Sequence, residues 1–241
     1  MQGRALAVRG AEQEHRKPRF TREQIAKAAL KIADTEGFEA LSMRRLADAL
    51  GAGTMTLYYY VRTKEDLLTL VEDALLGEIF EASDPLPKAW RAAVSKLAAA
   101  TRATYLRHAW ALRSLTALRV GPNGLRHIEQ SLESVASLDL SIAKKLQILS
   151  VVDDYVVGHC AGLMRRQSLD RKSARALGEA MKRYLGEGDH PQLRAVFGDD
   201  PVDAFVKSAG FTTDATHFDL GLEALLDGLS KRFKLAVRPH G

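Results

Sequence analysis

Apolar residues recur along most of this chain at the three- and four-residue intervals of a helix. In the first such segment Ile25, Ala29 and Ile32 share one face, between a capping box that begins at Thr21 and a terminating Gly37. No run of alternating β-branched residues lies between turn signals, as a half-buried strand would require. The pattern therefore predicts an all-α fold.

Two short helices follow the first one and are separated by a tight turn. One covers about two turns between Ser42 and Gly51, and the other covers residues 54–60. A two-turn helix, a glycine turn and a second short helix, packed on a longer first helix, make up a helix-turn-helix module. We expect these helices to form an N-terminal three-helix bundle, after which Thr63 caps a fourth helix over residues 64–80.

Prolines at positions 85 and 87 interrupt the pattern and indicate a boundary near residues 81–87. Beyond it, we expect helices over residues 87–108, 111–119, 124–136, 141–167, 170–185 and 215–235. The 241 residues, 46% of them apolar, can bury a core without disulfides or a structural metal. Cys160 is the single cysteine and no apolar stretch is long enough to cross a membrane, which favours a cytoplasmic protein with no cofactor.

The excess of positive charge is confined to the first quarter of the chain. Residues 1–64 hold 12 Lys and Arg against 7 Asp and Glu, whereas the remaining residues hold 23 of each. A basic segment joined to a larger neutral body suggests that the first quarter binds a polyanion. A solvated basic surface is the alternative interpretation.

The second short helix presents hydroxyl, methyl and aromatic groups when Leu57 faces inward, and such groups suit base edges and phosphates in a DNA major groove. Arg44 precedes it, while Thr21 and Lys64 stand at helix N-termini, where backbone N–H groups favour phosphate. The candidate DNA-contacting residues are therefore Thr21, Arg44, Thr54, Met55, Thr56, Tyr58, Tyr59, Tyr60 and Lys64. Part of Tyr60 is expected to pack inward instead.

The stretch from Thr21 to Leu68, with SMRRLADALG and AGTMTLYYYVRTKEDLL, resembles the N-terminal domain of TetR-type bacterial transcriptional regulators. Such regulators more often carry histidine where Tyr60 stands. The resemblance implies that Arg44 and the short helix face bases or the groove, and that Tyr58 and Lys64 hold phosphates. Residues 218–229, FDLGLEALLDGL, resemble the last helix of a tetracycline-repressor-like C-terminal domain.

These observations divide the chain into four parts. We expect a flexible basic tail over residues 1–18, a helix-turn-helix DNA-binding domain over 19–66, a connecting helix and linker over 67–86, and a larger helical regulatory and dimerisation domain over 87–241.

The larger domain offers candidate ligand and dimer contacts. Apolar residues with interspersed polar groups at helical spacing predict the wall of a ligand pocket, and plain core packing is the alternative. The candidate pocket residues are Trp90, Leu97, Thr101, Tyr105, His108, Trp110, Arg113, Tyr155 and His159. Small residues on the helices predicted over 141–167 and 215–235 allow other helices to pack closely against them, either from a second copy of the chain or from the same chain. The candidate dimer contacts are Gly158, Ala161, Gly162, Gly221, Ala224, Leu225 and Gly228.

The combined prediction is a TetR-type regulator, most often a repressor in such proteins, that binds a palindromic operator DNA as a homodimer and leaves it when a small-molecule effector binds. A ligand-independent, structural DNA-binding protein is one alternative. The other is a helical enzyme using Asp153, Asp154 and His159, but the spacing places Asp154 and His159 off one face, and no HExxH, phosphate loop or nucleophile elbow accompanies them. We therefore expect no enzymatic activity and no bound metal.

Overall fold

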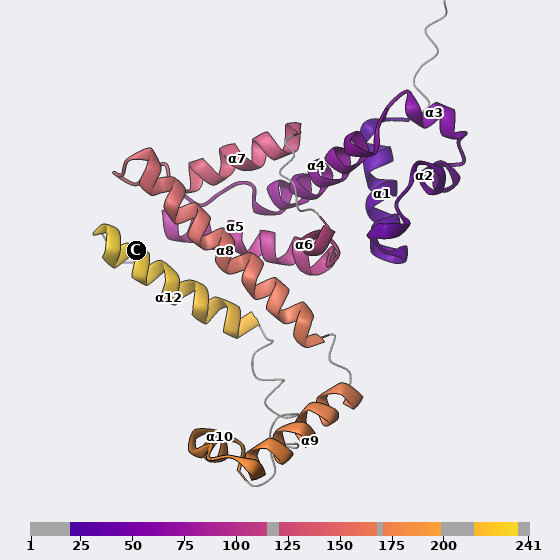
Figure 1. Ribbon diagram of the computed structural model, residues 1–241. Helices are drawn as coiled ribbons and strands as arrows, with labels where there is room; N and C mark the ends of the chain where they lie inside the picture. Colours follow the sequence, from indigo (N-terminus) through magenta and orange to yellow (C-terminus); the bar gives the residue numbers. More distant parts are fainter. Residues whose placement is uncertain (1–19, 115–120, 168–170, 199–214, 236–241) are drawn as a thin grey trace, which may run out of the picture.

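The computed structural model describes residues 20–114, 121–167, 171–198 and 215–235, and these residues form helices without a strand (Figure 1). The all-α prediction is thus confirmed for the described residues. The predicted tail over 1–18 and the end of the helix predicted over 111–119 lie outside them.

The N-terminal bundle consists of α1 (Arg22–Glu36), the short 3-10 helix η1 (Phe38–Ala40), α2 (Met43–Leu50), α3 (Thr54–Tyr58) and the start of α4 (Lys64–Ser83). The capping box at the start of α1 is present: the Thr21 hydroxyl accepts from the Gln24 backbone N–H at 3.2 Å, and the Gln24 side chain accepts from the Thr21 N–H at 2.9 Å. Gly51 ends α2 in the left-handed conformation with φ of 60°, which favours glycine. Ile25, Leu46 and Leu57 are fully buried at the centre of the bundle.

Helix α4 connects the bundle to the body. Its first half packs on α1, whereas its second half packs on α5 (Trp90–Arg107) and α7 (Pro122–Ser134). The Asp73 carboxylate accepts from the Gly124 N–H at 2.9 Å, where a negative group stabilises the N-terminus of α7. Ser83 donates to Gln130 at 2.6 Å near the end of α4. The connecting helix is therefore tied to the body at the first turn of α7 and again about one turn before its end.

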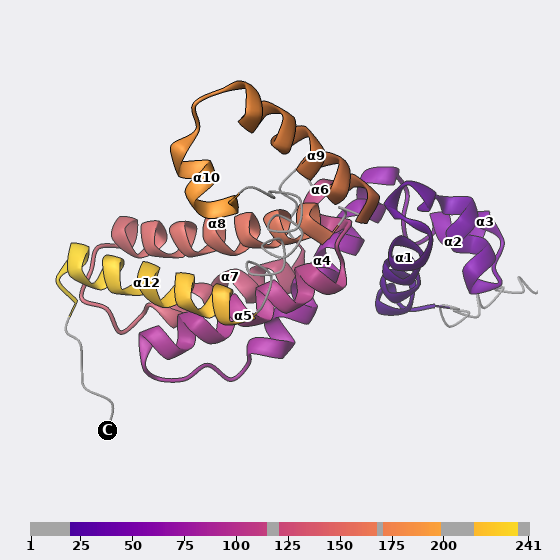
Figure 2. The ribbon, with the colours of Figure 1, turned by 90° about the horizontal axis from the view of Figure 1, so that it is seen from below.

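The body is built around α8 (Ile142–Gln167), which packs on α5 and beside α12 (Ala215–Phe233), while α6 (Ala111–Ser114) lies near the bundle (Figure 2). Its core contains Val94 from α5, Ile148 and Cys160 from α8, and Phe218 and Leu226 from α12, each at most 2% exposed. No helix among the described residues is long and apolar enough to cross a membrane.

Helices α9 (Arg171–Glu187) and α10 (Pro191–Phe197) form an arm that projects from the body in Figure 1. The Arg194 guanidinium donates to the carbonyl oxygens of Leu185 and Gly188, at 2.8 and 3.0 Å, and folds α10 back on α9. The pattern analysis did not predict α10, because seven residues are too few to show a helical period. Its signals are local: Pro191 at the first position and Gly198, with φ of 62°, just after the end.

Candidate DNA-reading surface and body cavity

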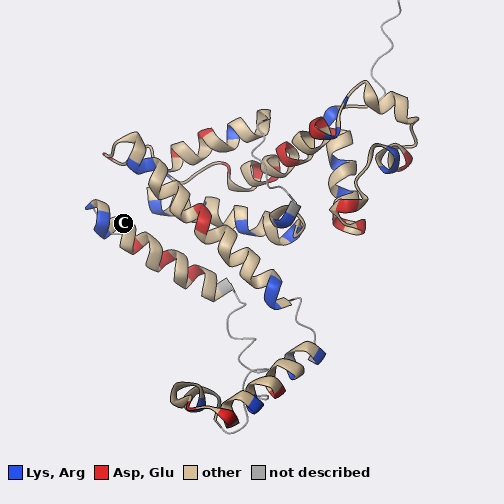
Figure 3. Cartoon of the chain, viewed as in Figure 1, with Lys and Arg blue, Asp and Glu red and all other residues tan. Residues whose placement is uncertain are grey.

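Helix α3 presents an uncharged outer face at one end of the molecule (Figure 3). Leu57 anchors the helix at 0% exposure, whereas Met55 and Tyr59 are 81% and 80% exposed. Tyr58 is also exposed, and Thr54 and Thr56 are partly so. A short helix with a buried anchor and large exposed side chains has the form of an element that enters a groove.

Cationic groups flank α3 on its neighbouring helices. Arg44 is exposed on α2, and Lys64 is the exposed first residue of α4. Asp66 accepts from the backbone N–H groups of Arg62 and Thr63 at 3.0 and 3.1 Å, and so uses its carboxylate for the capping box rather than for Lys64. Thr21 lies at the N-terminus of α1, which it caps. The predicted DNA-contacting residues therefore all lie on the bundle and at the start of α4.

Tyr60 has a packing role. It is partly buried against the bundle core, and its hydroxyl accepts from the Phe20 backbone N–H at 3.2 Å. Its ring meets the edges of Phe20 and Tyr59, at centroid distances of 6.5 and 5.3 Å. Tyr60 therefore ties the end of the short-helix region to the start of α1.

Two predicted pocket residues lie instead where the bundle meets the body. The His108 ring is 4% exposed; its Nδ1 lies 2.7 Å from Asp34 Oδ1 on α1, and its Nε2 lies 3.0 Å from Glu78 Oε2 on α4. Trp110 donates from its indole N–H to Asp34 at 2.8 Å and stacks on Phe38 with centroids 5.2 Å apart. We call Asp34, Glu78, His108 and Trp110 the interdomain junction.

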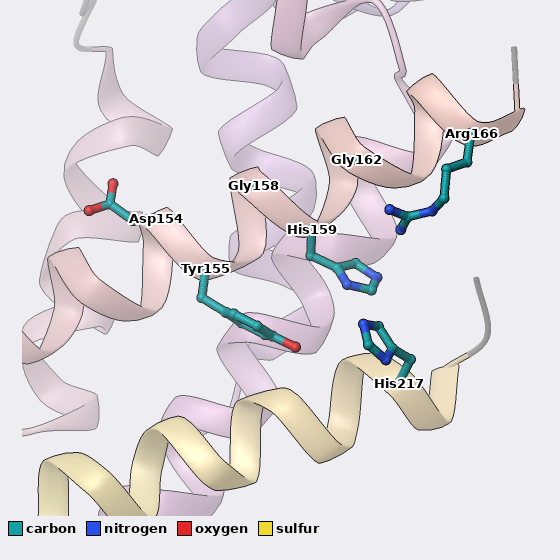
Figure 4. A pocket seen from close by; sticks show the side chains of 7 residues that line it. All are labelled: Asp154, Tyr155, Gly158, His159, Gly162, Arg166 and His217. Carbon is teal, nitrogen blue, oxygen red and sulfur yellow. The ribbon is translucent and has the colours of Figure 1, made fainter. Parts of the chain in front are cut away.

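The body contains a cavity of about 310 Å³ between α8 and α12 (Figure 4). Its lining residues are Asp154, Tyr155, Gly158, His159, Gly162, Arg166 and His217. Tyr155 and His159 come from the predicted pocket set. Arg166 and His217 carried no sequence signal, since they are about fifty residues apart and no motif connects them.

The other predicted pocket residues do not line this cavity. Leu97 and Thr101 are buried, with the Thr101 hydroxyl donating to the Leu97 carbonyl at 2.9 Å. Trp90 packs against the body core, and Arg113 is exposed. Burial raises the pKa of Tyr105, which packs between the two cores, to about 12. Ligand contact by these five residues stays a prediction that the cavity does not support.

The small residues predicted at a dimer interface have different surroundings. Gly158, Ala161, Ala224 and Gly228 are exposed, and Gly162 borders the cavity together with Gly158, while Leu225 is partly buried against the body core. At Gly221 a side chain would collide with Tyr155 of the same chain, whose hydroxyl donates to the Phe218 carbonyl at 2.8 Å. Gly221 is thus explained by a close approach within one chain.

The three residues of the enzyme alternative do not form a cluster. Asp154 and His159 both border the cavity, but the Asp154 carboxylate points away from the His159 ring (Figure 4). Asp153 is exposed and is not a lining residue. Within the described ranges, no group of three or more His, Cys, Asp or Glu side chains could hold a metal ion.

A helix-turn-helix bundle with an exposed short helix, joined by one long helix to a larger helical body with a cavity, defines a two-part DNA-binding regulator. Comparison with family models agrees. Residues 25–71 match the model described as bacterial regulatory proteins of the tetR family, and residues 84–233 match the tetracyclin repressor-like C-terminal domain. The chain belongs to the TetR family of bacterial transcriptional regulators.

Similar proteins support the same assignment. The transcriptional repressor DrrR1 of Streptomyces coeruleorubidus is 34% identical, over 88% of this chain and 78% of the relative. A transcriptional regulator of Saccharopolyspora erythraea is 32% identical, over 94% and 91%. The structure of ActR of Streptomyces coelicolor with actinorhodin superposes with a TM-score of 0.66 at 28% identity, covering 89% of this chain and 98% of ActR. The family models and the two curated relatives are transcriptional regulators and not enzymes, in agreement with the prediction.

Proposed function

We propose that this protein represses transcription by binding a palindromic operator as a homodimer, and that a small molecule bound in the body releases it. The observation that carries the proposal is the outer face of α3 and its C-cap, where Met55 and Tyr59 stay about four-fifths exposed although Leu57 between them is fully buried. Exposed apolar and aromatic groups of this kind usually serve an interaction. The place of action would be the cytoplasm, where the bacterial chromosome lies.

Dimerisation is supported by apolar side chains left exposed on α8 and α12. Val151 on α8 and Leu220 on α12 are 39% and 69% exposed, and the exposed small residues Gly158, Ala161 and Ala224 lie on the same two helices. Two helices from each of two chains would bury these groups in an isologous interface. Since one short helix contacts only a few base pairs, two-fold symmetry would also double the length of the operator that is read.

Release by a ligand is supported by the cavity and by the connection through α4. ActR has been captured with actinorhodin and with (S)-DNPA, which shows that a relative with the same fold binds small molecules. Here α4 begins beside α3 and ends against α7 of the body. A ligand that prefers one position of α4 would change the separation of the two α3 helices and hence operator affinity.

Selection of bound duplexes from a random DNA pool, at stated salt concentration, tests the proposal. We expect an enriched inverted repeat with half-sites about one helical turn or slightly more apart, bound by two chains per duplex. Footprinting that found one asymmetric half-site bound with full affinity would contradict the dimer. Compounds are then screened for release of labelled operator from the protein. If no compound releases the operator or raises the thermal stability of the protein, the proposal of a small-molecule effector is contradicted.

A further inference from the structure

Positive charge is concentrated in the residues that precede the N-terminal bundle. Residues 1–19 hold five Lys and Arg against two Asp and Glu, whereas residues 20–64, which include the helix-turn-helix, hold seven against five. Three of the five stand together in the sequence RKPR at positions 16–19, and the next acidic residue along the chain is Glu23. We call residues 16–19 the RKPR segment. Its charge favours contact with a polyanion.

The bundle gives the predicted DNA-reading helix little charge of its own. Helix α3 carries no charged residue (Figure 3). On the preceding helix, Arg45 donates from Nε to Glu36 Oε2 at 2.8 Å, so that its charge is already paired within the bundle. Because phosphate contacts supply much of the affinity of a protein for DNA, cations close to α3 but outside it have a purpose.

The RKPR segment begins from a fixed point beside α3. Phe20, which directly follows it, donates from its backbone N–H to the Tyr60 hydroxyl at 3.2 Å, and the two rings meet edge to face with centroids 6.5 Å apart. Tyr60 in turn meets the ring of Tyr59, which is 80% exposed, at 5.3 Å. The RKPR segment therefore joins the bundle on the side that carries the predicted DNA contacts.

Reach and shape favour the minor groove as the place of the RKPR segment. Four extended residues span about 14 Å at most, which is enough to cross one sugar-phosphate strand from the major groove that α3 would enter. The groove beyond that strand is the minor groove, which is about 6 Å wide and too narrow for a helix of about 10–12 Å in diameter. Pro18 disfavours the helical conformation at Lys17 and favours an extended chain, which suits such a groove.

We propose that the RKPR segment binds in the minor groove beside each half-site, and that Arg16 and Arg19 there select A·T over G·C base pairs. The proposal rests on the proposed function, because the segment reaches this groove only when the bundle lies on DNA. An A·T pair offers the acceptors adenine N3 and thymine O2 to a guanidinium, whereas guanine adds its N2 amino group, which is itself a donor. Narrow A·T-rich minor grooves also have a strongly negative potential that attracts arginine.

Inosine in the flanking base pairs tests this proposal. The selected operator is prepared with A·T, G·C or I·C pairs about five base pairs, or half a helical turn, to either side of the positions that α3 contacts. Inosine lacks the N2 amino group of guanine but keeps its major-groove acceptors. We expect the full-length protein to bind duplexes with A·T or I·C flanks about fivefold more tightly than those with G·C flanks. Equal affinity for all three, or I·C flanks that behave as G·C flanks do, would overturn the proposal.

Charge-matched variants of the full-length chain then locate the effect. Arg16→Gln with Arg19→Gln removes two charges from the RKPR segment, and Arg4→Gln with Arg9→Gln removes two charges farther from Phe20. We expect the first variant to bind A·T flanks about fivefold more weakly and to lose the flank preference, and the second to keep that preference. Weakening by the same factor for every flank, or loss of the preference in both variants, would overturn the assignment.

The same titrations separate this proposal from the proposed function. If the wild-type protein binds an inverted repeat but does not distinguish the flanks, the minor-groove contact is wrong and the regulator stands. If the pool selection enriches no inverted repeat, the proposed function fails and the minor-groove contact fails with it. The midpoint of thermal unfolding, measured for the wild type and both variants, keeps loss of folding out of the comparison.

Discussion

Replacing His108 with alanine tests whether the interdomain junction holds the DNA-binding bundle against the body. The ring lies between two carboxylates that belong to different helices, Asp34 of α1 and Glu78 of α4. Each ring nitrogen lies within hydrogen-bonding distance of one carboxylate, with Nδ1 2.7 Å from Asp34 and Nε2 3.0 Å from Glu78. His108→Ala would remove both interactions and the packing of a nearly fully buried ring.

The magnitude follows from the number and exposure of these interactions. Hydrogen bonds to charged groups contribute about 1.5–3 kcal/mol each. Both carboxylates keep another donor, since Trp110 donates to Asp34 at 2.8 Å and Arg107 to Glu78 at 2.6 Å, and both are about one-third exposed. We therefore expect a loss of about 3 kcal/mol in the free energy of unfolding, and a Tm lowered by about 6–12 °C.

Thermal and urea unfolding followed by circular dichroism measure this loss. A double-mutant cycle with Asp34→Ala isolates the pair, and we expect a coupling energy of about 1–3 kcal/mol between residues in direct contact. His127→Ala is the matched control, because His127 is a partly buried histidine outside the junction. A loss below about 0.5 kcal/mol for His108→Ala, the size of an ordinary surface substitution, or zero coupling to Asp34, would refute the junction.

Three further predictions concern the DNA contacts and the single thiol. Lys64→Ala should weaken binding to the selected operator and to random DNA alike. It should also reduce the slope of log affinity against log salt concentration by about one for each phosphate that Lys64 neutralises in a half-site. Arg44→Ala should instead relax the preference at particular base pairs, by about 1–3 kcal/mol for a bidentate contact, as measured by repeating the pool selection; uniform weakening would show that Arg44 does not read bases. Burial raises the pKa of the fully buried Cys160 to about 11, so the thiol should stay protonated near neutral pH. It should react with a disulfide reagent only after unfolding, and rapid reaction of the folded protein would contradict this.

The helix boundaries could be predicted because their signals are local. The capping boxes at Thr21 and Thr63 and the turn at Gly51 involve residues within one turn of each other, and the structure has all three. The inward position of Leu57 followed in the same way from a short helix that has one buried face. The exposed face of α3 is the complement of that buried face, and for this reason the candidate DNA contacts lie together.

The cavity could not be predicted as well, because it depends on where helices end and on which helices meet. His108 continues the helical spacing of Trp90 and Leu97, but α5 ends at Arg107, and His108 has non-helical angles of −111° and 61°. Its ring consequently points toward α1 and α4 rather than along the face of α5. Arg166 and His217 come together only because α8 packs beside α12, and no spacing within either helix indicates that contact.

The measurement that tests the central claim most directly is the distance between the two bundles of a dimer on its operator. A spin label at Lys31→Cys, an exposed position of α1 outside the predicted DNA contacts, is introduced with Cys160→Ala so that one label is carried per chain. We predict a single narrow distance on the selected operator, loss of that distance on a duplex with one half-site scrambled, and a shifted or broadened distribution when a releasing compound saturates the body. An operator complex without any coupling between labels would contradict the account, because it would show that one chain alone occupies the DNA.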